Sequence, residues 1–365
     1  MNLHLSLKHI VALGAVACAA LLPAAQADAQ KVDFKGKRIL VTVPFAPGGG
    51  SDVYIRALQP FLEKHLPGNP NIIVLNVPGS RSIPGANRFQ ERAVADGTHA
   101  IVVSATTVGS FVFSRSKVKY DLDKWEPVLL SPQGVVIYTT PALGVGGTKD
   151  LAKLKGKALV FGGQSAAGGE ARSVLTFELL GLKPKYVWGM NRGPVRLAFE
   201  RNELNINYDS MPGYLGAASK LVKAGKAVPL YSLGITDSKG NIVRDPNVPD
   251  LPHFVEAYEL MYGKKPSGPG YAAWKSVHNM MTMLNKGIFL PAGTPKPVLN
   301  AWHTAIANTF KGPDFEKEAG KIIEGYPQFI GEAAKPIIKD ATSFTPEAWA
   351  WLKNYYKTEH KVTIE

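Results

Sequence analysis

Two glycine-rich turns in the sequence combine residue types that bind anions. The first, residues 43–52, reads VPFAPGGGSD. Its glycines lack a Cβ, so the backbone can turn sharply and approach a ligand closely. Ser51 can cap a helix, and Asp52 suits the first turn of that helix. The free N–H groups and partial positive charge of a helix N-terminus favour an anion, so this turn is a candidate anion site.

The second turn repeats this plan. The apolar run 158–161 leads into residues 162–169, which read GGQSAAGG, and a helix is expected from about 170 to 180. One charge-assisted hydrogen bond contributes about 1.5–3 kcal/mol, and a helix terminus about 0.3–1 kcal/mol. A micromolar complex needs roughly 8 kcal/mol. A few such contacts from the two turns would therefore hold a small carboxylate.

The second turn also permits a different chemistry. Residues 163–167, GQSAA, nearly match the G-x-S-x-G nucleophile elbow of α/β-hydrolases, with Ser165 in the nucleophile position. An acid and a base follow in an allowed order, from Asp209 or Asp245 and from His253, His278 or His303. Ala167 replaces the last glycine, and no histidine precedes the glycines at 48–50, which weakens the match. A secreted serine esterase is the alternative to a binding site.

Metal and nucleotide chemistry have little support in the sequence. The eight histidines are scattered, no H-E-x-x-H spacing occurs, and the only cysteine is Cys18. The first turn lacks the Gly-Lys-Ser/Thr that completes a Walker loop. We therefore expect no metal and no cofactor.

The composition and the N-terminal segment limit the classes of function that the chain can have. The 365 residues are 45% hydrophobic and carry a net charge of +13, which suits a two-domain globular protein that attracts nucleic acid, membrane or small anions. Residues 1–29 are typical of a signal peptide, with Lys8, an apolar run at 10–22 and A-x-A cleavage sites. Cys18 resembles a lipidation site only faintly. Export argues against nucleic acid as a partner, and no later stretch reaches membrane-spanning length.

The elements that position the turns alternate between strands and helices. Strand-like runs at 38–43, 71–76 and 99–104 each end in glycine, proline or small polar residues. This alternation predicts a parallel sheet with ligands beyond the carboxyl ends of its strands. Runs around 132–134 and 288–295 suggest crossings between two lobes. We expect lobe 1 at 30–134 and 287–365, lobe 2 at 135–286, and hinges near 131–134 and 287–291.

The order of short motifs resembles that of the Bug-type periplasmic receptors, the solute receptors of tripartite tricarboxylate transporters. Residues 44–52, PFAPGGGSD, are similar to the family signature P-F-x-P-G-G-x-x-D. Residues 76–79, NVPG, are similar to its N-x-P-G turn, and residues 291–295 to its P-A-G-T-P. Residues 161–165, FGGQS, occupy the place of its second ligand loop. The similarity covers nearly the whole chain after residue 29.

The resemblance implies a type II periplasmic binding protein fold, an α/β fold with two lobes joined by a hinge and a ligand cleft between them. It implies a periplasmic, non-enzymatic receptor that captures a small di-, tri- or aromatic carboxylate. The receptor would deliver this solute to membrane subunits of a tripartite tricarboxylate-type transporter. We expect a monomer with no nucleic-acid partner.

The resemblance also implies a set of ligand-binding residues. The first turn supplies Phe45, Ala46, Pro47, Gly48, Gly49 and Ser51, and the second supplies Gln164, Ser165 and Ala166. Ser80, Thr106 and Asp209 lie at neighbouring strand ends. The chain departs from the family at 80–85, SRSIPG, where Arg81 either pairs with a second carboxylate or is a solvated surface residue. Trp188 and Met190 either line an apolar wall of the cleft or fill the core of the second lobe.

Overall fold

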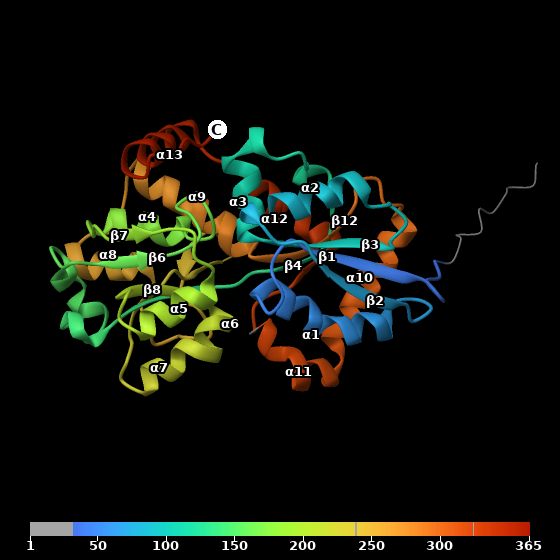
Figure 1. Cartoon of the computed structure of the whole chain (residues 1–365), viewed down its shortest axis with the longest axis horizontal. Coiled ribbons are helices and arrows are strands. Elements are labelled where there is room, and N and C mark those ends of the chain that lie inside the picture. Colours follow the sequence, from blue (N-terminus) through green and yellow to red (C-terminus); the bar gives the residue numbers. More distant parts are fainter. Residues whose placement is uncertain (1–31, 238, 324) are drawn as a thin grey trace, which may run out of the picture. The chain divides into compact units, whose positions relative to one another are not determined.

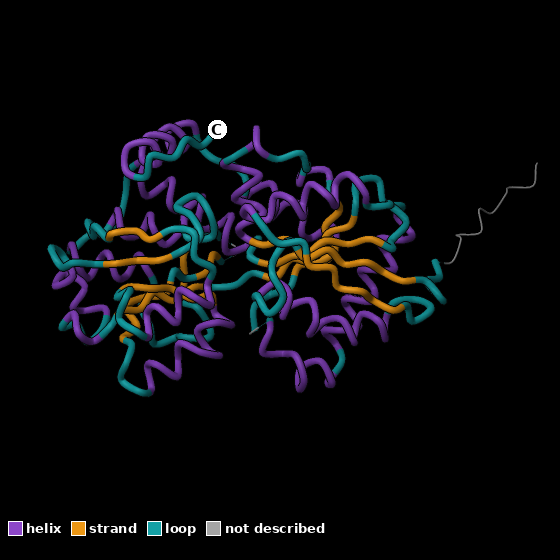
Figure 2. The backbone as a smooth tube through the Cα atoms, viewed as in Figure 1, coloured by secondary structure: helices purple, strands orange, loops and turns teal. Residues whose placement is uncertain are grey.

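The computed structural model describes residues 32–237, 239–323 and 325–365. The signal peptide expected at 1–29, with Cys18, lies outside these residues. The strands form two main sheets, each with helices on its faces (Figures 1 and 2). No helix in the described ranges is long and apolar enough to cross a membrane.

The first sheet has six strands in the order β13-β4-β12-β3-β1-β2. Strands β1, β2 and β3 are parallel, whereas β12 is antiparallel to both β3 and β4. The strand bounds are β1 (Arg38–Val43), β2 (Asn71–Asn76), β3 (His99–Ser104), β4 (Glu126–Ser131), β12 (Lys286–Leu290) and β13 (Phe329–Ile330). The associated helices are α1 (Gly50–His65), α2 (Ile83–Arg92), α3 (Ala105–Phe113), α10 (Lys296–Lys311), α11 (Pro313–Ala319) and α12 (Ala334–Ala341).

Helix α1 shows how the first sheet and its helices, the first half of the protein, position the first turn. Its buried apolar residues are Tyr54, Ile55, Leu58, Phe61 and Leu62, which recur at the spacing of one helix face. This face packs on the core that also contains the apolar side chains of β1. Because β1 runs directly into α1, the turn between them lies at the carboxyl end of the parallel strands.

The second sheet has five strands in the order β7-β6-β8-β5-β9. Strand β6 is parallel to β7 and β8, and β5 is antiparallel to β8 and β9. The strand bounds are β5 (Val135–Thr139), β6 (Val160–Gly162), β7 (Lys185–Val187), β8 (Ile206–Ser210) and β9 (Val228–Ser232). A small ribbon contains β10 (Ile235–Thr236) and β11 (Ile242–Val243). The helices are α4 (Ala171–Leu179), α5 (Arg192–Glu200), α6 (Met211–Gly213), α7 (Ser219–Lys223), α8 (Phe254–Tyr262) and α9 (Pro269–Met283).

The chain crosses between the sheets at two short segments. Residues 132–134 join β4 to β5, and residues 284–285 join α9 to β12. The first crossing lies where the sequence predicts a hinge. The sequence predicts the second hinge at 287–291, whereas the chain crosses just before it, and residues 286–290 form the buried strand β12. Gly134 has no room for a Cβ, which would collide with the Asp245 carboxylate.

The C-terminal helix α13 (Pro346–Glu359) packs on α9 (Figure 1). Its Tyr356 hydroxyl donates to the Ala166 carbonyl at 3.1 Å, so this helix contacts the second glycine turn. The sequence interpretation assigned residues 287–365 to lobe 1. Residues 32–365 form one contact-connected unit, and the lobe boundaries stay a prediction.

Candidate functional site

The first turn is shaped by a buried carboxylate. Asp52 accepts bonds from the Gly48 N–H at 2.9 Å, from Arg56 Nε at 2.9 and 3.0 Å, and from Asn76 Nδ2 at 2.9 Å. Burial raises the pKa of Asp52, but the bonds from Arg56, Gly48 and Asn76 outweigh it, so the pKa is lowered. Gly48 adopts the left-handed region with φ 73°, which favours glycine. Asp52 therefore joins the turn to the end of β2.

The start of α1 differs from the sequence expectation. Its N-cap is Gly49, not Ser51, and no side chain caps it. Ser51 is buried within the first helical turn. Ala46, Pro47 and Gly48 are exposed, and Phe45 packs against the first-sheet core. The helix start therefore keeps N–H groups without a side-chain acceptor, as an anion site requires.

A carboxylate also organises the second turn. Glu170 is buried, and its Oε1 accepts bonds from the Gln164 N–H at 3.1 Å and from the Tyr208 hydroxyl at 3.4 Å. The Gln164 carbonyl accepts from the Gly189 N–H at 3.2 Å. Because the Gln164 N–H already donates to Glu170, this backbone group of the second turn has a partner within the protein. Ala166 is buried in the core, as its bond with Tyr356 indicates.

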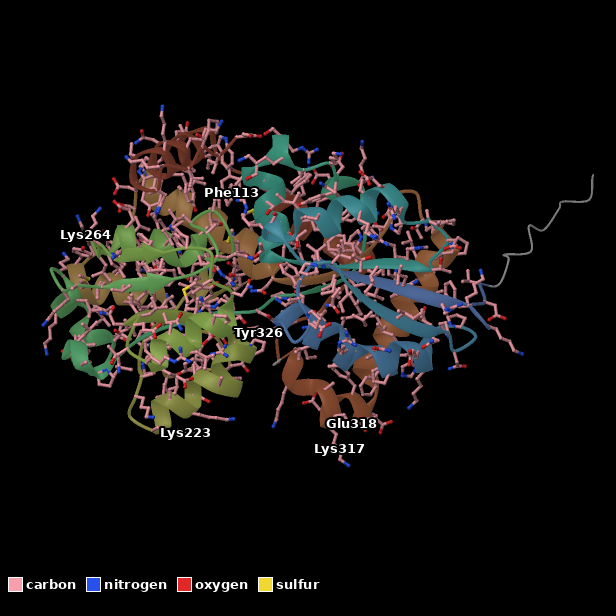
Figure 3. All side chains as sticks on the ribbon, in the orientation of Figure 1. Phe113, Lys223, Lys264, Lys317, Glu318 and Tyr326 are labelled. Carbon is pink, nitrogen blue, oxygen red and sulfur yellow. The ribbon has the colours of Figure 1, made fainter. Side chains whose placement is uncertain are left out.

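The esterase constellation is not assembled in the described part of the chain. Ser165 Oγ is buried and has no hydrogen-bond partner there. The candidate bases have other roles: His253 caps α8, the ring of His278 lies 3.2 Å from Thr282 Oγ1, and His303 packs beneath Gly331. The Tyr326 hydroxyl donates to Asp245 (Tyr326 is labelled in Figure 3). Within the same described ranges, no group of three or more His, Cys, Asp or Glu side chains could hold a metal ion.

The second turn packs against the first sheet at α3. A Cβ added to Gly169 would lie 3.2 Å from Thr106 Oγ1, and one added to Gly109 would lie 3.6 Å from the Ala167 carbonyl. Ser104 caps α3 by accepting from the Thr106 N–H at 3.2 Å. Strand β3, which ends at Ser104, is paired with β1. Residues from both glycine turns therefore lie near the carboxyl end of the first sheet.

Lys286 is a residue of this edge that the sequence analysis missed. It pairs in register with Ser104 of β3 and Ser131 of β4. A Cβ added to Gly50 would lie 3.9 Å from Lys286 Cε, so the lysine lies at the start of α1. Burial lowers the pKa of Lys286 to about 7, and repulsion from Arg172 adds to the effect. A lysine beginning the apolar strand KGIFL was the signal in the sequence.

Arg172 is a second missed cation. It is 2% exposed, and its Nη1 donates to the Met281 carbonyl at 2.8 Å and to Thr282 Oγ1 at 3.1 Å. Burial lowers the pKa of Arg172 to about 10, so it stays charged at neutral pH. Its Nε has no hydrogen-bond partner among the described residues. Arg172 is the second residue of α4, just after the second turn.

Two predicted site residues have partners within the protein. Arg81 Nη2 donates to Ser114 Oγ at 3.1 Å, at the C-terminal end of α3. Ser114 is eight residues from Thr106, about 12 Å along the helix. Asp209 accepts from Arg196 at 2.6 and 3.1 Å and from the Tyr138 hydroxyl at 2.8 Å. Both carboxylate oxygens of Asp209 are therefore engaged within the protein, whereas Arg81 uses one of its five N–H donors on Ser114.

The remaining candidates lie near the surface or in packed clusters. Ser80 is exposed, and Ser80, Arg81 and Ser82 all have positive φ, at 33°, 56° and 71°. Trp188 stacks on Tyr186 with ring centroids 5.1 Å apart, and Met190 packs against the second-sheet core. The packing alternative given for Trp188 and Met190 therefore agrees with the structure.

Comparisons with known proteins agree on the fold. No family model matches the chain. A Pseudomonas sp. (strain P51) protein named UPF0065 protein in tcbD-tcbE intergenic region is 25% identical over 326 residues, covering 84% of this chain and 85% of that protein. The periplasmic binding protein BugD aligns with TM-score 0.62 and 18% identity, covering 88% of this chain and 97% of BugD.

Two structures of ligand complexes align similarly. MatC from Rhodopseudomonas palustris with bound malate has TM-score 0.62 and 22% identity, covering 86% of this chain and 97% of MatC. An R. palustris protein with adipate has TM-score 0.64 and 19% identity, covering 88% and 97%. The resemblance seen in the motifs is thus confirmed at the level of the fold. The chain has the two-sheet α/β fold of the Bug- and TctC-type periplasmic binding proteins.

Proposed function

We propose that the chain is a periplasmic solute-binding receptor. It captures a small organic carboxylate and passes it to the membrane subunits of a tripartite tricarboxylate-type transporter. The contact of Gly169 with Thr106 is the main observation in favour, because it brings the second turn to the sheet edge at which the first turn begins. The carboxylates bound to two proteins of the same fold, malate and adipate, agree with this proposal.

The proposed site combines backbone and side-chain donors. The uncapped start of α1 offers N–H groups from residues near Gly49 and Ser51. Thr106 Oγ1 and the unpartnered Ser165 Oγ are candidate hydroxyl donors from the two halves. Such neutral donors hold a carboxylate by many moderate bonds, each contributing about 1.5–3 kcal/mol because the acceptor is charged. Movement about the crossings at 132–134 and 284–285 would open and close the site.

The contacts of the described residues do not support the enzymatic alternative, although GQSAA resembles a nucleophile elbow. A serine nucleophile needs a base within hydrogen-bond reach, and Ser165 Oγ has no partner in the described residues. Asp209, which would orient the base, is bonded to Arg196 and Tyr138.

Calorimetry and thermal unfolding test the receptor function. The chain is purified from the periplasm of an expressing bacterium and stripped of bound solute by reversible unfolding. Malate, adipate, citrate and benzoate are then added, with the neutral diamide of adipate as control. A solute at a hundred times its Kd stabilises the folded state by about 2.7 kcal/mol. Stabilisation by a carboxylate but not by the diamide is expected, and the absence of any carboxylate effect would exclude the proposal.

A further inference from the structure

Lys286 is a buried cation at the start of α1. It is 8% exposed and begins strand β12, between β3 and β4. Its Nζ donates to the Asn285 carbonyl at 3.2 Å and to Asn285 Oδ1 at 2.8 Å. An ammonium group has three N–H donors. One donor of Lys286 is therefore without an acceptor among the described residues.

In the part of the chain that the structure describes, no carboxylate pairs with this charge. Within the described ranges, Lys286 makes no ion pair within 4.0 Å, although Asp52, the acidic residue in the first turn of α1, does so with Arg56. Arg172 is near enough to lower the pKa of Lys286, and the start of α1 adds a partial positive charge. Burying an unpaired charge is costly, so stability alone does not explain this lysine.

The charges around Lys286 favour an added anion. Three positive groups converge at this edge: the ammonium, the Arg172 guanidinium and the N-terminus of α1. The buried carboxylate of Glu170, whose charge acts on Arg172, is engaged by the Gln164 N–H and the Tyr208 hydroxyl. A solute carboxylate at the start of α1 would meet N–H donors and a free ammonium donor together.

We propose that Lys286 is a binding residue for the anionic end of the solute and remains without a counter-ion until that anion binds. This inference rests on the receptor function proposed above and adds a charged side chain to a site otherwise built from neutral donors. The lysine lies on the first sheet and Arg172 on the second-sheet side, so the solute would join positive groups from both halves.

Solute capture should then take up a proton. The pKa of about 7 for the solute-free ammonium means that part of Lys286 is neutral at physiological pH, and a nearby carboxylate would raise that pKa. Titratable groups on the elements around it include Tyr54, Asp52 and Arg56 on α1, Glu170 and Arg172 beside α4, and His278 on α9; His99 and Glu126 lie at the far ends of the paired strands β3 and β4. Burial raises the pKa of Tyr54 and lowers that of His278 to about 3, so both stay neutral from pH 6 to 8.5.

Calorimetry at pH 6, 7 and 8.5, in cationic buffers that differ in ionisation enthalpy and add no competing oxyanion, tests the proposal on the unmodified chain. Malate is the probe, with adipate in its place if malate does not bind, because both carboxylates stay ionised over this range. We expect uptake of a fraction of one proton that grows from pH 6 to pH 8.5. The Kd should rise with pH above 7, by at most about tenfold per pH unit.

Three variants separate the outcomes. Lys286→Met should weaken binding at pH 6 at least tenfold and abolish proton uptake, whereas Lys286→Arg should bind without proton uptake. Lys223→Met removes the same net charge from an exposed residue of α7 and should behave like the unmodified chain (Figure 3). The inference is overturned if the unmodified chain binds malate or adipate without proton uptake and no more tightly than Lys286→Met does. That result would leave the receptor function standing. Absence of binding by any carboxylate would instead overturn the receptor function.

Discussion

Gly169 and Thr106 touch across the two halves of the protein: a Cβ on Gly169 would lie 3.2 Å from Thr106 Oγ1. Gly169 ends the second glycine turn, and Thr106 is the second residue of α3 in the first half. A Cβ at this spacing would be tighter than an ordinary contact, so Thr106 would have to give way to a larger side chain at position 169. The glycine therefore lets the second turn approach α3 closely.

Enlarging Gly169 should weaken solute binding. Gly169→Val is expected to raise the Kd for malate or adipate at least tenfold, about 1.4 kcal/mol, because its side chain displaces the turn from α3. Thr106→Ala removes the atom that a Cβ would meet, so in the double variant the two losses should not add. Gly193→Val, at a site with no atom within 4 Å of the added Cβ, is the control. Simple additivity of the two changes would contradict the contact.

Asp209 should contribute to stability and not to binding. Asp209→Asn leaves Arg196 without its carboxylate, and breaking a largely buried pair costs about 3 kcal/mol. Urea unfolding measures this loss. Asp314→Asn breaks the exposed pair with Lys64 and should cost less than about 1 kcal/mol. If Asp209→Asn keeps its stability but loses solute affinity, the sequence expectation of a ligand residue is restored.

Ser165 should act as a modest donor and not as a nucleophile. Ser165→Ala removes one hydroxyl, so the Kd of the solute should rise no more than about tenfold. The free protein should be as stable as before or more so, because the removed Oγ was buried without a partner in the described residues. Both proteins should leave a nitrophenyl ester intact. Hydrolysis present in the unmodified chain and lost in Ser165→Ala would favour the esterase.

Lys286 should make the stability of the solute-free protein depend on pH. Its pKa is about 7 when folded and 10.5 in the reference state, so the unfolded chain binds more protons between these values. The free energy of unfolding should therefore rise from pH 7 towards pH 10, and below pH 7 the full cost of burying the charge remains.

Comparison with Lys286→Met isolates this contribution. Because methionine has no charge to desolvate, the variant should be more stable by about 1–4 kcal/mol at pH 6, with a difference that shrinks as pH rises. Urea unfolding of the solute-free proteins at pH 6, 7, 8 and 9 measures it, with Lys223→Met as the charge control. A variant that is less stable at pH 6 would mean that Lys286 is compensated within the protein.

Local patterns in the sequence predicted the positions of the parallel strands of the first half closely. The strands expected at 38–43, 71–76 and 99–104 are β1, β2 and β3. Each is a short apolar run bounded by glycine, proline or polar residues, and such runs depend on neighbours within a few positions. The two turns were visible for the same reason, since glycine and helix-start residues act locally.

The pairing of charges was not visible in the same way. Asp52 bonds Asn76 of β2, Asp209 bonds Arg196 of α5, and Arg81 contacts Ser114 beyond α3. Each partner is 13 to 33 residues away. A sequence shows that a charged residue exists near a turn, but not which partner neutralises it.

The order of amino acids is enough to specify the two strand–glycine turn–helix units and to predict an anion site at each, because backbone freedom and helix-end charge are local properties. Two other features follow from the packing of distant segments: the second turn meets α3 at Thr106, and Lys286 lies at the start of α1 without a carboxylate partner in the described residues. Both features depend on contacts between the two halves and on the pairing of strands that lie far apart in the sequence. Burial, which sets the charge state of Lys286, depends on every element that excludes water from it.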